Sequence, residues 1–403
     1  MWRSSLYWRL SGFYWSYFAL VGSFMPFWGL YLKHQGFSIL AISQLLAISS
    51  ATKLVAPNLW GYLADRFSIR IAIIRLGAFG AFTVFLCVFL PLKFVGMFFM
   101  MSVFSFFWNA ILPQFEVVTL RHLVGRTHIY SRIRSWGSFG FIISVVGGGI
   151  LFDYISIDYL PYFMLALLLT IFLSSCWVAE PEWTFSPKQQ KKDFWQQLKQ
   201  PSMMVFFLVC FLMQFSHGPY YTLFSIYLDK LHYSHAAIGG LWALGVFSEI
   251  VLFWLIPRWF QRYSLSSFIL IATLLAAVRW FLLGYFANYL IGLIVAQLLH
   301  AATFALFHLA CLHWVHKYFS ADYQGQGQAL YNSIGYGAGG SLGALSAGIL
   351  WKLGSSTLAF VMAGVVCLIA SIVIAFGLRH LVIQYQGAEV ENDPRMTAAI
   401  QEQ

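Results

Sequence analysis

The sequence predicts an all-α membrane protein in which twelve transmembrane helices form two pseudo-symmetric halves of six. Three observations predict it: an apolar composition, a regular succession of long apolar segments, and a weak internal repeat. Of the 403 residues, 60% are hydrophobic and 9% are charged, whereas soluble domains carry about 25% charged residues. The mean hydropathy is +0.74. A lipid bilayer is therefore the expected surrounding of the chain.

Twelve apolar segments are each long enough to cross a bilayer, which takes about 20 mostly apolar residues. They are residues 10–32, 39–63, 71–91, 95–117, 133–154, 159–179, 203–228, 236–257, 265–286, 289–312, 325–350 and 356–379. The longest polar stretch between them leaves six segments on either side. We therefore expect an N-terminal six-helix half over 1–179, a cytoplasmic central loop over 180–200, a C-terminal half over 201–379 and a polar cytoplasmic tail over 380–403.

The basic residues predict the orientation of the chain. Of the 24 Lys and Arg residues, two lie within apolar segments, at positions 53 and 279. If both termini are cytoplasmic, nearly all the others fall on the inner side, and the outer segments hold only Lys33, Lys93, Lys230 and Lys352. An excess of basic residues is typical of cytoplasmic loops. The net charge of +10 therefore indicates topology rather than a nucleic-acid partner.

An internal repeat supports the division into halves. Residues 31–66 align without a gap on residues 227–262. Two parallel six-helix repeats are a transporter architecture, with the substrate site near the bilayer midplane between the repeats. The alignment places Lys53 opposite Glu249, so both are expected at similar depth.

Glu249 is unusual because no other charge occurs between Ala236 and Pro257. A charged residue at the centre of a membrane helix costs at least about 2.5–3.5 kcal/mol and is a functional candidate by default. Lys53 is expected to attract a substrate anion, although a lysine can also extend toward the membrane surface. Together with Arg279, it would leave the cavity net positive when Glu249 is protonated, which suits a monocarboxylate.

The segment GYLADRFSIR, residues 61–70, resembles the signature loop of the major facilitator superfamily, GxLaDrxGrr. The family's positions are filled by Gly61, Asp65, Arg66 and Arg70. Ser68 stands where the family usually has Gly, which raises the question of whether the turn is kept. The resemblance implies the major facilitator fold and a gating role for this loop; an ordinary charged loop is the alternative.

Five further stretches resemble the phenylpropionate permease branch of that superfamily, which is related to the lactose permease. They are FMPFWGLYLKHQGFS (24–38), YSRIRSWGSFGFI (130–142), GVFSEIVLFW (245–254), AVRWFLLG (277–284) and HAATFALFHLACLHWV (300–315). The resemblance implies a proton symporter of the bacterial inner membrane. It would take up a small organic acid, 3-phenylpropionate or a related aromatic carboxylate, by alternating access. Its partners would be the substrate, protons and the bilayer, and it would function as a monomer.

In lactose-permease-like carriers, an acid, an arginine and a helix-10 histidine of the C-terminal half take part in proton coupling. The resemblance assigns this role to Glu249, Arg279, His300 and His308. Exclusion of water favours a protonated carboxyl group, and a nearby cation favours the carboxylate. Histidine exchanges protons near neutral pH. A structural ion pair and hydrogen-bonded packing histidines are the alternatives, and the segment boundaries do not rank the two histidines by depth.

Other polar residues are candidates for the substrate site. Gln214, His217 and Tyr221 are spaced i, i+3 and i+7, which puts them on one helix face. The dipeptide Gly218-Pro219 is expected to bend that helix, so it either lines the cavity or carries a plain packing kink. Asn109 is a further substrate candidate.

The gate has candidates of its own. Glu116 and Arg134 lie on neighbouring helices and resemble the sugar-site pair of the lactose permease; a cytoplasmic gate is the equal alternative. Residues 137–149 and 335–348 are rich in small residues, which permit close helix contacts. We expect these two helices to slide across the interface between the halves. Drug/proton antiporters of the superfamily that this chain resembles usually have a Gly-Pro element in helix 5. No proline occurs between residues 132 and 160, so the resemblance disfavours drug efflux.

Other classes of protein fit less well. A membrane enzyme such as an acyltransferase would need clustered catalytic groups, but the histidines are scattered and no Walker, HExxH or GxSxG motif occurs. The five cysteines lie in separate apolar segments, so we expect no disulfide, metal or cofactor. A non-transporting sensor on the same fold would need a large soluble domain. Among transporters, nucleosides or oligosaccharides are the alternative substrates, and a neutral ligand would make Lys53 dispensable.

Overall fold

The structure is a computed structural model that describes residues 5–124, 126, 129–181, 192–256, 259, 262–320 and 323–377. Residues 182–191 of the expected central loop and all of the expected tail lie outside these residues. So do some of the basic residues used to predict the orientation, namely Arg3, Lys188, Lys191, Arg258, Arg379 and Arg395.

The described residues form helices almost throughout. The α-helices of the first half are α1 (Ser5–His34), α2 (Ile39–Ala51), α3 (Ala56–Phe67), α4 (Arg70–Phe85), α5 (Phe94–His122), α6 (Tyr130–Tyr154) and α7 (Leu160–Cys176). After the short α8 (Lys192–Leu198) come α9 (Pro201–Ser216), α10 (Gly218–Lys230), α11 (His235–Leu255), α13 (Leu265–Phe286), α14 (Leu290–Leu298), α15 (Phe307–Tyr318), α16 (Gln324–Asn332), α17 (Gly340–Leu353) and α18 (Ser356–Gly377). The 3₁₀ segments are η1 (Thr52–Leu54), η2 (Leu86–Phe89) and η4 (Ile157–Tyr159), and the π-helical segments are η5 (Ala301–Leu306) and η6 (Ser333–Gly339).

These helices confirm the predicted fold class. Within the described ranges, ten helical stretches are long and apolar enough to cross a membrane. Two more stretches have comparable length, α1 and the run from α16 through η6 to α17. Each of the twelve overlaps one predicted segment. The expected bend is present as a break at His217, where α9 ends and α10 begins before Pro219.

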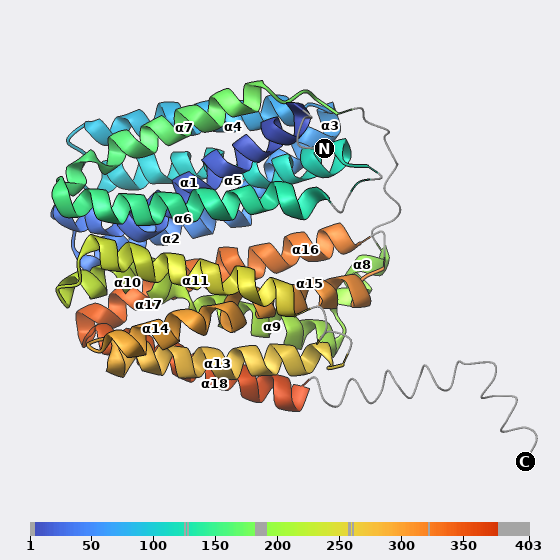
Figure 1. The fold of residues 1–403 in the computed structure, drawn as a ribbon. Helices are drawn as coiled ribbons and strands as arrows, with labels where there is room; N and C mark the ends of the chain where they lie inside the picture. Colours follow the sequence, from blue (N-terminus) through green and yellow to red (C-terminus); the bar gives the residue numbers. More distant parts are fainter. Residues whose placement is uncertain are drawn as a thin grey trace, which may run out of the picture.

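The helices gather in two groups (Figure 1). Helices α1 to α7 form the upper group of the picture, and α9 to α18 form the lower group. Between the groups, α6 contacts α11 and α17 contacts α2. The two helices rich in small residues therefore cross the interface between the halves.

Glycines bring these crossing helices together. A Cβ atom on Gly239 of α11 would lie 2.4 Å from the carbonyl oxygen of Val145 on α6. A Cβ atom on Gly348 of α17 would lie 2.5 Å from Ser43 of α2. No real side chain fits at such distances, so both contacts require glycine, and the backbones pack directly.

Polar contacts join the halves at the end away from the described termini. The carboxylate of Asp153, at the end of α6, accepts hydrogen bonds from the backbone N–H groups of His235 (2.7 Å) and Ala236 (3.1 Å). It thereby caps the N-terminus of α11 from the other half, where a negative charge is favourable. Lys33 of α1 and Asp229 of α10 add an ion pair of 2.9 Å. This end of the molecule is closed.

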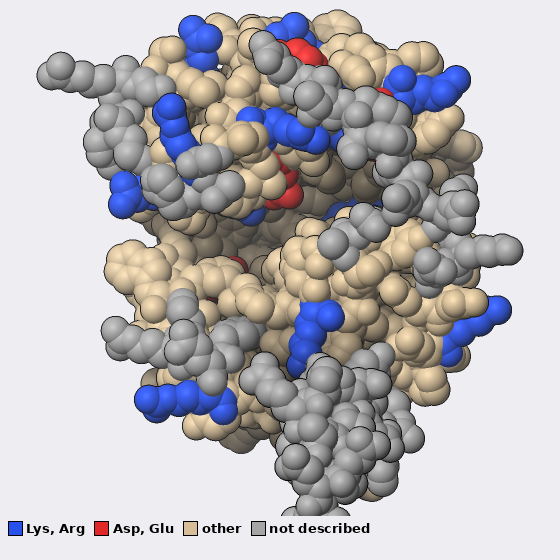
Figure 2. All heavy atoms as spheres, turned by 90° about the vertical axis from the view of Figure 1, so that its right-hand side faces the viewer, with Lys and Arg blue, Asp and Glu red and all other residues tan. Residues whose placement is uncertain are grey.

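The opposite end is open between the halves. Figure 2 looks onto the right-hand side of Figure 1 and shows a hollow between the two groups of helices, with acidic and basic atoms on its walls. The structure is therefore a state in which the interior is reached from the side of the described termini.

We expect Asp153→Ala to loosen the closed end. An N-cap residue contributes about 1 kcal/mol, so amide hydrogen exchange at residues 235–237 should accelerate about fivefold. Hydrogen-exchange mass spectrometry of the protein in nanodiscs measures this rate. Asp158→Ala is the matched control, because Asp158 contacts Gln35 and His34 rather than α11. Equal exchange in the two variants would contradict the capping role.

Candidate functional site

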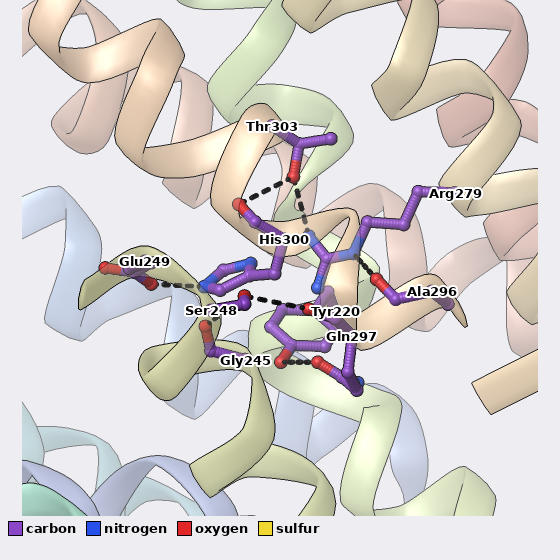
Figure 3. Close-up of polar contacts among 9 residues, drawn as sticks. All are labelled: Tyr220, Gly245, Ser248, Glu249, Arg279, Ala296, Gln297, His300 and Thr303. Atoms are coloured by element: carbon purple, nitrogen blue, oxygen red, sulfur yellow. Dashed lines mark hydrogen bonds and ion pairs between the residues drawn. The ribbon is translucent and has the colours of Figure 1, made fainter. Parts of the chain in front are cut away.

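The central polar contact joins Glu249 of α11 to His300, which lies between α14 and η5. The Nε2 atom of His300 is 2.8 Å from Oε1 of Glu249, and their side chains are 6% and 14% exposed. Figure 3 shows the imidazole ring directed at the carboxylate. Transfer of one proton from a protonated His300 to an ionised Glu249 would neutralise both side chains, and the reverse transfer would restore both charges. Little water reaches either group.

The backbone around His300 explains why the pair can form. The π-helical segment η5 begins directly after His300 and widens the helix there, as is frequent at functional sites. On the facing helix, Gly245 leaves room for the ring, since a Cβ atom there would lie 3.2 Å from Cδ2 of His300. The Nδ1 atom of His300 is buried and has no hydrogen-bond partner among the described residues.

Arg279 of α13 lies behind this pair, fully buried. Its Nε donates to the carbonyl of Ala296 (3.0 Å) and its Nη1 to Oγ1 of Thr303 (3.1 Å). The guanidinium also covers the ring of Tyr220, 4.3 Å from the ring centroid, a cation–π contact. Within the described residues Arg279 forms no ion pair with Glu249, whose direct partner is His300.

Two further hydrogen bonds, both to Gln297, lie between the Glu249–His300 contact and Arg279. The hydroxyl of Tyr220 donates to Oε1 of Gln297 at 3.0 Å, and the hydroxyl of Ser248 donates to the carbonyl of Gln297 at 3.3 Å (Figure 3). No pattern in the sequence pointed to Gln297 or Thr303. Both residues flank His300 in the chain. Gln297 accepts a hydrogen bond from Tyr220, and Thr303 accepts one from Arg279, so each fixes a side chain near His300.

His308 lies further along the same face and does not contact Glu249. The rings of His300, Phe304 and His308 follow one another at 5.4 and 6.2 Å between centroids, nearly parallel. The Nδ1 atom of His308 is 3.0 Å from the hydroxyl of Tyr331 and 3.3 Å from that of Tyr336. Of the two histidines, the structure therefore brings His300 to the acid.

The first half contributes Lys53 and Asn109. Lys53 lies in η1, where the second predicted segment departs from α-helical geometry next to η6 of the other half. Within the described part of the chain, it forms no ion pair or hydrogen bond. The amide of Asn109 is already engaged, donating to Oγ1 of Thr52 (2.8 Å) and to the carbonyl of Ser49 (3.2 Å). Asn109 therefore supports the irregular segment that carries Lys53.

The three polar residues of the seventh predicted segment have different surroundings. His217 is fully buried, and its Nδ1 lies 2.8 Å from the carbonyl of Met213. Gln214 is buried against Gly335 and Gly339 of η6. Tyr221 is half-buried, with its ring 5.9 Å from the His217 ring and 6.3 Å from that of Trp242. Tyr221 is the most accessible of the three.

The signature loop is organised around Arg70. Its guanidinium forms an ion pair with Asp65 and donates a hydrogen bond to Gln114 of α5. A Cβ atom on Gly61 would lie 3.4 Å from the amide of Gln114, and Arg66 is exposed. Ser68 adopts a φ of 53°. Ser68 therefore adopts the left-handed conformation that glycine takes readily, and the turn forms with serine at this position.

One contact of this loop was not expected from the sequence. The carboxylate of Glu180 accepts hydrogen bonds from the backbone N–H groups of Arg70 (3.1 Å) and Ile71 (2.7 Å). Glu180 follows α7 and caps the start of α4, which ties the loop to the end of the first half. The available signal was the position of Glu180 as the first acid after the sixth apolar segment.

Glu116 and Arg134 face each other on α5 and α6. Nε of Arg134 is 3.9 Å from Oε1 of Glu116, and both side chains are about one third exposed. The guanidinium lies over Phe18, 3.9 Å from the ring centroid.

Two six-helix groups, closed at one end and hollow at the other, with an ionisable pair at the centre, define a membrane transporter rather than an enzyme. A sequence model of the MFS_1 like family matches residues 7–362. The chain belongs to this family, whose members have the major facilitator fold expected from the signature loop.

Individual relatives agree on transport but differ in cargo. The chain is 28% identical to the "Probable 3-phenylpropionic acid transporter" of Escherichia coli (strain K12), over 84% of this chain and 89% of the relative. It is 24% identical to the "Maltose permease" of Geobacillus stearothermophilus, over 90% and 93% of the two chains. The crystal structure of the nucleoside transporter NupG has a TM-score of 0.78 at 18% identity, over 92% of this chain and 98% of that one.

We expect Arg279→Leu to destabilise the protein strongly. The change removes the buried hydrogen bonds of the guanidinium to the Ala296 carbonyl and the Thr303 hydroxyl, a loss of about 3 kcal/mol in the free energy of unfolding. Urea unfolding in detergent micelles measures it. Arg134→Leu is the matched control, since a partly exposed ion pair is worth at most about 1 kcal/mol. Equal losses in both variants would show that the contacts of Arg279 carry no special stability.

Proposed function

We propose that the protein takes up a small organic acid together with protons, by alternating access. An aromatic monocarboxylate such as 3-phenylpropionate is the favoured substrate. The observation that carries this proposal is the contact between Glu249 and His300, two titratable side chains that are almost fully buried. Two titratable groups are held 2.8 Å apart and nearly out of reach of water. Ionisable groups inside a membrane are costly and usually functional, and a change in the protonation of Glu249 and His300 during transport would give them a function.

The pair supplies a proton-dependent switch. With Glu249 ionised and His300 protonated, the two attract each other and hold α11 against η5. When Glu249 accepts a proton, this attraction ends and the positive charges of Arg279 and Lys53 are no longer offset by the carboxylate. The interior between the two halves then carries a net positive charge, which favours the binding of an anion. This order couples proton uptake to substrate uptake.

Lys53 supplies the binding site for the anion. Its side chain is half-buried in η1, with no acidic partner within the described residues. Leu54, the next residue, touches the other half: a Cβ atom on Gly337 would lie 2.9 Å from its Cδ2. A carboxylate held by Lys53 therefore lies at a contact between the halves, where binding affects their relative position.

The protein acts as a monomer in the bacterial inner membrane, with both termini in the cytoplasm. The distribution of Lys and Arg residues supports this orientation. The hollow of Figure 2 then faces the cytoplasm, and the Asp153 cap lies on the outer side. Uptake begins when that outer end opens.

A neutral substrate is the second candidate. Relatives described as a maltose permease and a nucleoside transporter support oligosaccharides or nucleosides. With such a cargo Lys53 would play no part in binding. A non-transporting sensor on the same fold is the remaining alternative, and any substrate-dependent proton uptake excludes it.

We expect Glu249→Gln to abolish uphill accumulation while sparing exchange, because an amide cannot load and release the proton. The test is the external pH of de-energised cells on addition of 3-phenylpropionate, followed by nucleosides and maltose. Native protein should alkalinise the medium with the aromatic acid. Asp158→Asn, which changes an exposed acid, serves as the control. Undiminished alkalinisation by the Glu249→Gln protein would refute the coupling role.

We expect Lys53→Met to weaken binding of anionic substrates about tenfold, which corresponds to ~1.4 kcal/mol. The methionine keeps much of the length and removes the charge. Binding to purified protein, followed by isothermal titration, measures the change, with Lys93→Met as a control at an exposed lysine. If affinity for a neutral ligand falls equally, Lys53 supports the fold and not the anion.

A further inference from the structure

The first half contains a cavity that is separate from the hollow between the halves. It has a volume of about 480 Å³ and lies between α1, α6 and α7. Its outer rim is formed by the exposed residues Trp8, Leu173 and Trp177. Since these are surface residues of a membrane-spanning bundle, the cavity opens to the bilayer. Its volume lies within the range of small-molecule sites, about 300–1,000 Å³.

The cavity lies at interfacial depth, near the first turns of α1 and the last turn of α7. Tryptophan concentrates at membrane–water interfaces, where its ring meets the headgroups. Four tryptophans line this one cavity: Trp8, Trp15, Trp136 and Trp177. Trp136 is fixed in the wall by a hydrogen bond from its Nε1 to the hydroxyl of Tyr7, at 2.9 Å.

One cation and one unused hydroxyl complete the lining. Arg9 is the charged residue of the lining, and within the described residues it forms no ion pair. Ser11, 2% exposed, has a hydroxyl without a hydrogen-bond partner among those residues. The hydroxyls of Ser16, Thr170 and Ser174 each donate to a backbone carbonyl of their own helix. Ser11 therefore differs from the other hydroxyls of the cavity.

We propose that this cavity binds an anionic phospholipid of the surrounding leaflet. One acyl chain fills the apolar space between α1 and α7, the tryptophans pack around the glycerol region, and Arg9 holds the headgroup phosphate. The hydroxyl of Ser11 lies on the inner wall and donates to an ester oxygen. Charge complementarity selects the occupant: an anionic lipid is attracted by the basic residues at this end of the bundle, Arg9 in the lining and Arg132, which is exposed near the start of α6.

Gly12 makes the proposal testable without damage to the fold. It lines the cavity, and a Cβ atom built on it meets nothing within 4 Å. Leucine at position 12 therefore fills the space proposed for the acyl chain without a backbone clash. Gly147 of α6 is exposed and has equally open surroundings, but it is not part of the cavity. Gly147→Leu is the matched control.

The experiment measures retained lipid by native mass spectrometry of full-length protein in detergent, after equilibration with equal amounts of phosphatidylglycerol and phosphatidylethanolamine. Native protein and the Gly147→Leu variant should retain phosphatidylglycerol in preference. Gly12→Leu and Arg9→Gln should each retain about fivefold less of it. Thermal unfolding of all four proteins checks that each is folded.

Two results would overturn the proposal. One is equal retention of the two lipids by native protein, which would mean that the cavity holds bulk lipid without selection. The other is undiminished phosphatidylglycerol in Gly12→Leu or in Arg9→Gln, which would place the retained lipid elsewhere on the protein. A loss confined to both cavity variants supports the site.

Discussion

The structure depends first on the absence of water from the bilayer. A backbone that crosses it must bond to itself, so helices are required nearly everywhere. Departures from regular helix in the middle of a span are therefore informative. Here they are η1, the break at His217, η5 and η6. Each lies beside polar groups of the interior: Lys53 is in η1, and η5 begins directly after His300.

Burial then decides how the charges are arranged. Arg279 donates its hydrogen bonds to a carbonyl and a hydroxyl on the helix of His300, so its position and that of the imidazole depend on the same irregular turn. Glu249 is left to His300 as its direct partner. A shift of η5 would move Thr303, one acceptor of Arg279, relative to Ala296 of α14, the other acceptor, and would displace the adjoining His300. The electrostatic environment of Glu249 would then change, because both His300 and Arg279 would have moved.

Much of the fold follows from sequence patterns. Twelve apolar segments, the polar stretch between the halves and the signature loop predict the helices and their family, because lipid imposes length and composition on each span. The pattern also singled out Glu249, since an isolated acid in an apolar segment is conspicuous. It could not reveal π-helical turns, which depend on packing against the facing helix. For that reason it did not distinguish His300 from His308 or detect Gln297.

Contacts made between distant segments were equally invisible. Asp153 and Glu180 read as ordinary acids at helix ends, and only the tertiary arrangement shows that each caps another helix. Asn109 read as a free polar group, whereas its amide is occupied by Ser49 and Thr52. The domain boundaries and the assigned roles of the site residues stay predictions.

The cap on α11 gives solvent a direct part in the working cycle. When the halves separate at that end, the N–H groups of His235 and Ala236 lose the Asp153 carboxylate, and water must take its place. Each opening of this end therefore exposes these N–H groups to water, and each closure removes that water again. Solutes excluded from protein surfaces oppose such wetting. The balance between the closed and the open state of this end therefore depends on the osmotic state of its surroundings.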